Sequence, residues 1–112
     1  MRVSLARAIV VKPGIMLFDE PFAALDDLLR MRLNEEILRL REGDGWTGLF
    51  VTHNIAEAVF LSRRVVMLMG QPATVVDVAD VPFPYPREQS LRTTPEFNAI
   101  VQRLTDRLMG AM

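Results

Sequence analysis

The segment Ile15-Met16-Leu17-Phe18-Asp19-Glu20-Pro21 decides how the rest of this 112-residue chain is interpreted. Four consecutive apolar side chains end abruptly at two carboxylates and a proline. A run this short between chain-breaking residues is typical of a β-strand that is buried on both faces, as strands of parallel sheets are. We therefore expect a strand over residues 15–18 and a turn that begins at Asp19.

Helices and strands are expected to alternate after this strand. Apolar spacing predicts three helices and three further strands: helices over residues 27–41, 55–62 and 95–109, and strands over residues 49–52, 65–69 and 74–78. Asp26 or Asp27 stands where a cap for the first of these helices would lie. This order of elements is typical of an α/β protein with a parallel sheet and right-handed crossovers. The strand over residues 74–78 is expected to lie antiparallel beside residues 65–69.

Two other segments carry local signals. Residues 2–11 have the apolar pattern of the end of a helix, which Pro13-Gly14 stops. Alternating prolines in residues 82–87 predict an extended and poorly packed segment.

The composition excludes several classes of protein. A hydrophobic fraction of 50% with 24% charged residues supports a modest core and argues against a disordered tail. Thirteen Lys and Arg against fourteen Asp and Glu give a net charge of -1, which does not support binding of nucleic acid through bulk charge. The absence of cysteine excludes disulfides and Cys-based metal sites. The apolar runs are far shorter than the ~20 residues of a membrane-spanning helix. Together with the absence of cysteine, this leads us to expect a soluble protein of a reducing compartment.

Three side chains that can carry chemistry follow the first two strands. Asp19 and Glu20 follow the first strand and His53 follows the second. Because the carboxyl ends of parallel strands share one edge of the sheet, these side chains are expected to face a common site. An aspartate there can hold Mg²⁺ directly or through water, a glutamate can polarise a water, and a histidine can contact a phosphate oxygen. Taken singly, the carboxylates also fit a solvated turn and the histidine fits a cap or a surface group.

The same residues resemble, in order, the motifs of ATP-binding cassette (ABC) ATPases. Residues 15–21 resemble the Walker B motif, Ala24-Leu25-Asp26 the D-loop, and Val51-Thr52-His53-Asn54 the switch segment with the H-loop histidine. Residues 1–8 are similar to the helix that follows the signature sequence. The resemblance implies the C-terminal half of a P-loop NTPase fold, with a parallel sheet and helices. A partial ABC ATPase core would occupy residues 1–80, and a proline-rich connector with a C-terminal helix would occupy residues 81–112.

The C-terminal residues resemble one type of ABC ATPase in particular. Pro82-Phe83-Pro84-Tyr85-Pro86-Arg87, followed by Pro95-Glu96-Phe97, is similar to the end of nitrate, sulfonate and taurine importer ATPases. A linker followed by a helix that closes the core accounts for the same residues equally well.

The resemblance also implies roles for four residues. Asp19 would orient Mg²⁺ through water, and Glu20 would act as the general base. His53 would contact the γ-phosphate of ATP, and Asp26 would reach toward the second ATPase subunit of a head-to-tail dimer. The other implied partners are transmembrane permease subunits, with no nucleic acid, and the implied location is cytoplasmic, peripheral on the inner face of the cell membrane.

The chain also departs from the pattern of the family. It contains no G-x-x-x-x-G-K-[ST] phosphate loop, and the glutamine loop and the adenine-stacking aromatic are absent as well. ATP and Mg²⁺ are therefore expected to bind only together with a missing N-terminal half, and the isolated chain is expected to be inactive. Two functions stay open. One is a fragment of the ATP-hydrolysing subunit of an importer for a nitrate-, sulfonate- or taurine-like solute. The other is a nucleotide-free, degenerate half-cassette that acts only in docking or dimerisation.

Overall fold

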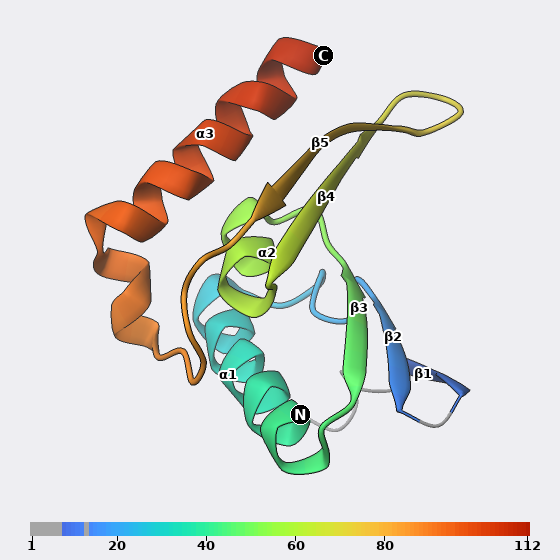
Figure 1. Ribbon diagram of the computed structural model, residues 1–112, viewed down its shortest axis with the longest axis vertical. Helices are drawn as coiled ribbons and strands as arrows, with labels where there is room; N and C mark the ends of the chain where they lie inside the picture. The colour runs from blue at the N-terminus through green and yellow to red at the C-terminus, as the bar shows by residue number, and fades with distance from the viewer. Residues whose placement is uncertain (1–7, 13) are drawn as a thin grey trace. The chain divides into compact units, whose positions relative to one another are not determined.

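The computed structural model describes residues 8–12 and 14–112 (Figure 1). The chain divides into two compact units between Asn54 and Ile55.

The first unit is a three-stranded sheet with one helix. Its strands are β1 (Ala8–Lys12), β2 (Ile15–Asp19) and β3 (Thr47–Val51), in the spatial order β1-β2-β3. β2 and β3 run parallel, as predicted, while β1 pairs with β2 in the antiparallel sense. Helix α1 (Asp27–Asp44) connects the two parallel strands (Figure 1).

Local signals define both ends of α1. The carboxylate of Asp26 accepts a hydrogen bond from the backbone N–H of Leu29 at 2.9 Å, which satisfies one of the free donors of the first turn. At the other end Gly45 adopts a left-handed conformation with φ 66°, which glycine reaches without steric cost. The predicted helix and its aspartate cap are therefore confirmed, and the helix continues to Asp44.

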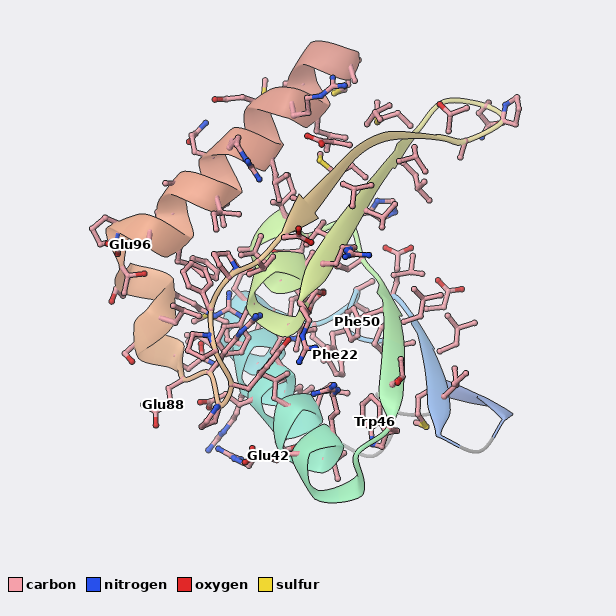
Figure 2. The ribbon with its side chains drawn as sticks, in the orientation of Figure 1. Phe22, Glu42, Trp46, Phe50, Glu88 and Glu96 are labelled. Carbon is pink, nitrogen blue, oxygen red and sulfur yellow. The ribbon has the colours of Figure 1, made fainter. Side chains whose placement is uncertain are left out.

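Aromatic side chains form the core of the first unit on one face of the sheet (Figure 2). The ring of Phe18 lies 5.5 Å from that of Trp46 and 5.6 Å from that of Phe50, and the ring of Phe22 lies 6.0 Å from that of Phe50. Phe18 and Phe22 are buried. Aromatic pairs at these separations stabilise a core beyond the area that they bury.

The prediction of a strand buried on both faces is only partly correct for β2, in which Phe18 is buried while residues 15–17 are half-buried. One face of the neighbouring strand β3 is exposed. Leu49 and Val51 are 64% and 45% exposed. Successive side chains of a strand point to opposite faces, so Phe50 lies on the packed side and its two neighbours lie on the open side.

The helix expected over residues 2–11 is wrong for residues 8–11, which belong to strand β1, and the rest of that range lies outside the described residues. Ile9, Val10 and Val11 are β-branched, and such side chains lose χ1 freedom in a helix and fit a pleated surface better. The backbone groups of β1 are satisfied by antiparallel pairing with β2, in which Ile9 lies opposite Leu17. Local apolar spacing did not reveal this pairing.

The second unit contains a β-hairpin and two α-helices, which can be followed in Figure 1. In chain order its elements are α2 (Ile55–Leu61), β4 (Arg64–Met69), β5 (Thr74–Asp80), the 3-10 helix η2 (Gln89–Thr93) and α3 (Pro95–Ala111). β4 and β5 pair in the antiparallel sense, as predicted. The expectation that β4 joins the parallel sheet is wrong, because it pairs with β5 in a separate two-stranded sheet. A tight turn brings β5 beside β4 directly and satisfies its hydrogen-bonding groups locally.

Helix α3 begins where the sequence predicts. The hydroxyl of Thr94 accepts a hydrogen bond from the backbone N–H of Phe97 at 3.2 Å, and Pro95 occupies the first helical position. Phe97 and Leu104 are buried, while α3 packs against α2 and β4.

The proline-rich segment is packed, which corrects the prediction of a loose linker. Arg87 is only 5% exposed, and burial lowers the pKa of its guanidinium below the ordinary value, although Tyr85 opposes that shift. Its Nη1 donates hydrogen bonds at 3.0, 3.0 and 2.8 Å to the carbonyls of Val59, Phe60 and Ser62. Tyr85 donates its hydroxyl to the carbonyl of Leu61 at 2.7 Å. The segment therefore satisfies the carbonyls that the last turn of α2 leaves without helical partners.

None of the helices among the described residues has the length and hydropathy of a membrane-crossing segment.

Candidate functional site

Glu20 and His53 meet at the carboxyl ends of the two parallel strands. Glu20 directly follows β2, and His53 comes two residues after β3. The Nε2 atom of His53 lies 3.2 Å from Oε1 of Glu20. The glutamate side chain is 27% exposed and the imidazole 91%, so the pair opens to solvent. The prediction of a common site at this edge is therefore confirmed for Glu20 and His53.

The register of the parallel strands explains this meeting. Asp19 lies opposite Val51 at the end of the β2–β3 ladder. The backbone N–H of Glu20 then donates to the carbonyl of Val51 at 2.8 Å, which continues the pairing one residue beyond β2. The two chains therefore leave the sheet at the same level, and their next side chains are neighbours.

Glu20 has a strained backbone. Its φ is 45°, and it is the one residue other than glycine with positive φ in the described part of the chain. The left-handed region costs an L-residue roughly 1–2 kcal/mol. Strain of this kind persists only where the surroundings hold it, and it is frequent at functional sites.

Asp19 is exposed and lies at the last position of β2. Among the described residues no group of three or more His, Asp or Glu side chains is arranged to hold a metal ion. Mg²⁺ does not require such a group, since it usually binds one or two carboxylates and takes its other oxygens from water and substrate phosphates. The Asp19 carboxylate therefore fits Mg²⁺ that arrives with a phosphate substrate better than a tightly held structural ion.

The structure gives Asp26 a local partner. Its carboxylate caps α1 through the N–H of Leu29, and its backbone carbonyl accepts from the N–H of Arg30 at 2.9 Å. The side chain is exposed at the start of the helix.

Arg30 also contacts this region, which no motif in the sequence predicts. Its Nη2 lies 3.4, 3.5 and 3.2 Å from the carbonyl oxygens of Phe22, Ala23 and Leu25. Its Nη1 pairs with Asp27 at 3.2 Å. These contacts attach the loop between β2 and α1 to the first turn of the helix. One feature of the sequence could have pointed to Arg30. It is a cation in the first turn of a predicted helix, where the helix macrodipole disfavours positive charge.

Comparison with known proteins shows what this chain is similar to. The chain is homologous to ATP-binding proteins of ABC transporters, of the nitrate and aliphatic sulfonate importer types, over most of its own length. No family model matches the chain.

Three relatives illustrate the match. An ATP-binding protein of Brucella abortus is 40% identical over 103 residues, which are 92% of this chain and 40% of the relative. The nitrate import ATP-binding protein NrtD of Synechococcus elongatus is 45% identical over 89 residues, 79% of this chain and 32% of the relative. An aliphatic sulfonates import ATP-binding protein of Xanthomonas axonopodis is 43% identical over 88 residues, 79% of this chain and 35% of the relative. The chain thus spans less than half the length of each of these relatives.

Proposed function

We propose that this chain carries the hydrolytic part of the ATP-binding subunit of an ABC importer. The contact between Glu20 and His53 at the ends of two parallel strands is the observation that carries this proposal. The strained backbone of Glu20 supports it, because a residue that needs only to be polar would not require that conformation. Homology to nitrate and aliphatic sulfonates import ATP-binding proteins supports a solute of the oxyanion or sulfonate class.

In this proposal Glu20 and His53 act together on the attacking water. The carboxylate of Glu20 accepts a proton from that water as it attacks the γ-phosphate of ATP. His53 contacts the γ-phosphate through its imidazole and limits the orientations of Glu20, because Nε2 lies 3.2 Å from the carboxylate. An exposed imidazole can reach a substrate phosphate without rearrangement of the sheet.

The two aspartates have separate roles in the proposal. Asp19 would hold Mg²⁺ through water, and the ion, when bound, supplies positive charge that offsets the charge of the triphosphate. Asp26, at the start of α1, would face a second ATPase subunit in a head-to-tail dimer.

The remaining features belong to the proposed whole protein. We assign residues 1–80 to the C-terminal part of a P-loop NTPase core and residues 81–112 to a connector and C-terminal helix. The phosphate loop would come from the part of the relatives that the match does not cover. Permease subunits would be the transmembrane partners, and the assembly would lie at the inner face of the cell membrane.

The test is an ATPase assay on this chain extended at its N-terminus by the preceding segment of the Synechococcus elongatus nitrate import relative. In the extended chain Glu20→Gln is expected to lower turnover by roughly 10²–10⁴-fold, because the amide keeps the shape of the carboxylate but accepts no proton. Binding of a fluorescent ATP analogue should be retained.

Glu42→Gln is the matched control, since Glu42 is an exposed carboxylate near the end of α1 (Figure 2). It should leave turnover unchanged. If Glu20→Gln hydrolyses ATP at the parental rate, the proposed role of Glu20 is wrong. A folded extended chain that binds no nucleotide would instead favour a docking or dimerisation module.

A further inference from the structure

We propose that Arg30 is a positioning residue for the Glu20–His53 pair. By holding three carbonyls of the loop that follows Glu20, its guanidinium keeps the Glu20 backbone in the conformation that directs the carboxylate to His53. The geometric part of this inference concerns the chain alone. Its catalytic meaning rests on the proposed function.

The loop that Arg30 contacts, residues 21–26, is anchored by the buried ring of Phe22, but its backbone makes few regular hydrogen bonds. Residues 21–26 belong to neither the sheet nor the helix, and most of their carbonyls lack the regular partners of those elements. Two turn hydrogen bonds lie within it, from the N–H of Ala23 to the carbonyl of Glu20 at 3.3 Å and from the N–H of Leu25 to the carbonyl of Phe22 at 3.1 Å. The planar guanidinium adds contacts to several carbonyls at once, which a point-like ammonium does not reproduce.

The hydrogen bonds to the loop carbonyls, and not the electrostatics of the helix, explain where the Arg30 side chain lies. It is the fourth residue of α1, where the aligned peptide dipoles disfavour a cation. Asp27 offsets part of this cost at 3.2 Å, but that carboxylate is 89% exposed and such surface pairs contribute little. The Arg30 side chain, in contrast, is only 16% exposed and lies against the loop.

The contacts lead directly to Glu20. Ala23 accepts from Arg30 through its carbonyl and donates to the carbonyl of Glu20 through its N–H. On its other side the N–H of Glu20 is bound to Val51 in β3. The strained residue is therefore held between the sheet and the loop that Arg30 fixes. Release of the loop would let Glu20 relax toward negative φ, and the direction of its side chain would change with it.

The test uses the imidazole of His53, which is the single histidine of the chain and gives one Cε1–Hε1 NMR signal. The spectrum of Glu20→Gln, recorded at a fixed neutral pH, gives the reference position of the His53 signal in the absence of the Glu20 carboxylate. Arg30→Met keeps an unbranched side chain of good helix propensity but removes the donors. We expect it to move the His53 signal at least about half of the way toward the Glu20→Gln position, because the loop then samples conformations without the contact.

Arg32→Met is the matched control, since Arg32 is an exposed arginine of the same helix, and it should leave the signal in place. An unchanged His53 signal in Arg30→Met, with the far-UV circular dichroism of the parent, overturns the proposal. If Arg30→Met does not fold, Arg30→Lys decides. A displaced signal then supports the role of the guanidinium, and a signal at the parental position refutes it.

This result is independent of ATP hydrolysis. A displaced signal together with an inactive extended chain would retain the positioning role and refute the proposed function. In an active extended chain, Arg30→Met should lower the turnover number with a smaller change in KM, because it misplaces the base without removing a substrate contact.

Discussion

Each of the two units holds a short stretch of backbone with an arginine, and the two arginines do so differently. Arg87 is 5% exposed and donates to carbonyls at the end of α2 at distances of 2.8 to 3.0 Å. Arg30 contacts its loop carbonyls at 3.2 to 3.5 Å, and it also forms an ion pair with the exposed carboxylate of Asp27. The same chemical group thus makes shorter, buried bonds in one unit and longer, partly solvated bonds in the other.

This difference predicts that one arginine contributes mainly to the stability of its unit and the other mainly to the orientation of a side chain. The carbonyls that Arg87 satisfies belong to a helix end, and loss of their donor inside a packed region leaves buried acceptors without partners. The loop that Arg30 contacts remains near solvent, where water replaces a lost donor at small cost. We therefore expect Arg87 to matter mainly for the free energy of unfolding and Arg30 mainly for the direction of Glu20.

The largest expected effect is that of Arg87→Ala. It should destabilise the second unit by about 3–5 kcal/mol, because it removes several charge-assisted hydrogen bonds and leaves buried carbonyls unsatisfied, at a cost of about 1–3 kcal/mol for each such group. Urea unfolding followed by the absorbance of Tyr85, the single tyrosine, reports on this unit. Arg103→Ala, at an exposed arginine of α3, is the control and should unfold as the parent does.

A smaller effect is expected for Arg30→Met, about 1–2 kcal/mol, since its hydrogen bonds are longer and water can reach the loop. The fluorescence of Trp46, the single tryptophan, reports on the first unit because its ring packs against Phe18. Arg32→Met again serves as the control. A loss as large as that of Arg87→Ala would contradict the distinction between the two arginines.

The smallest effect is expected for Asp27→Asn. Its carboxylate is 89% exposed, so the ion pair with Arg30 should contribute about 0.5 kcal/mol or less, and still less at high salt. The Trp46 unfolding midpoint measured at low and high salt checks this. A clear loss of stability that salt removes would show that Asp27, and not the loop carbonyls, determines where Arg30 lies.

Local signals in the sequence predicted much of this structure. The strand that ends at Asp19 and the helix that Asp26 caps were predictable, because turn residues and caps act over a few positions. The meeting of Glu20 with His53 was also predictable, since it follows from the parallel order of two strands.

Features that depend on pairing over longer distances were not predictable in the same way. The pattern of Ile9, Val10 and Val11 fitted a helix until antiparallel pairing with β2 was known. The sequence also does not reveal that β4 leaves the parallel sheet, because an apolar run does not say which neighbour it will pair with. The contacts of Arg30 and Arg87 were missed for a further reason: their acceptors are backbone carbonyls, which every residue has and no sequence pattern marks.

The positive φ of Glu20 has a consequence for any attempt to make this protein more heat-resistant. A glycine at position 20 would relieve the steric conflict of the left-handed backbone, so selection for thermal tolerance alone would favour the loss of this side chain. The gain in tolerance would remove the carboxylate that reaches His53. Thermostabilised descendants of this chain should therefore be checked at this codon, because a change that relieves backbone strain here also removes the proposed base.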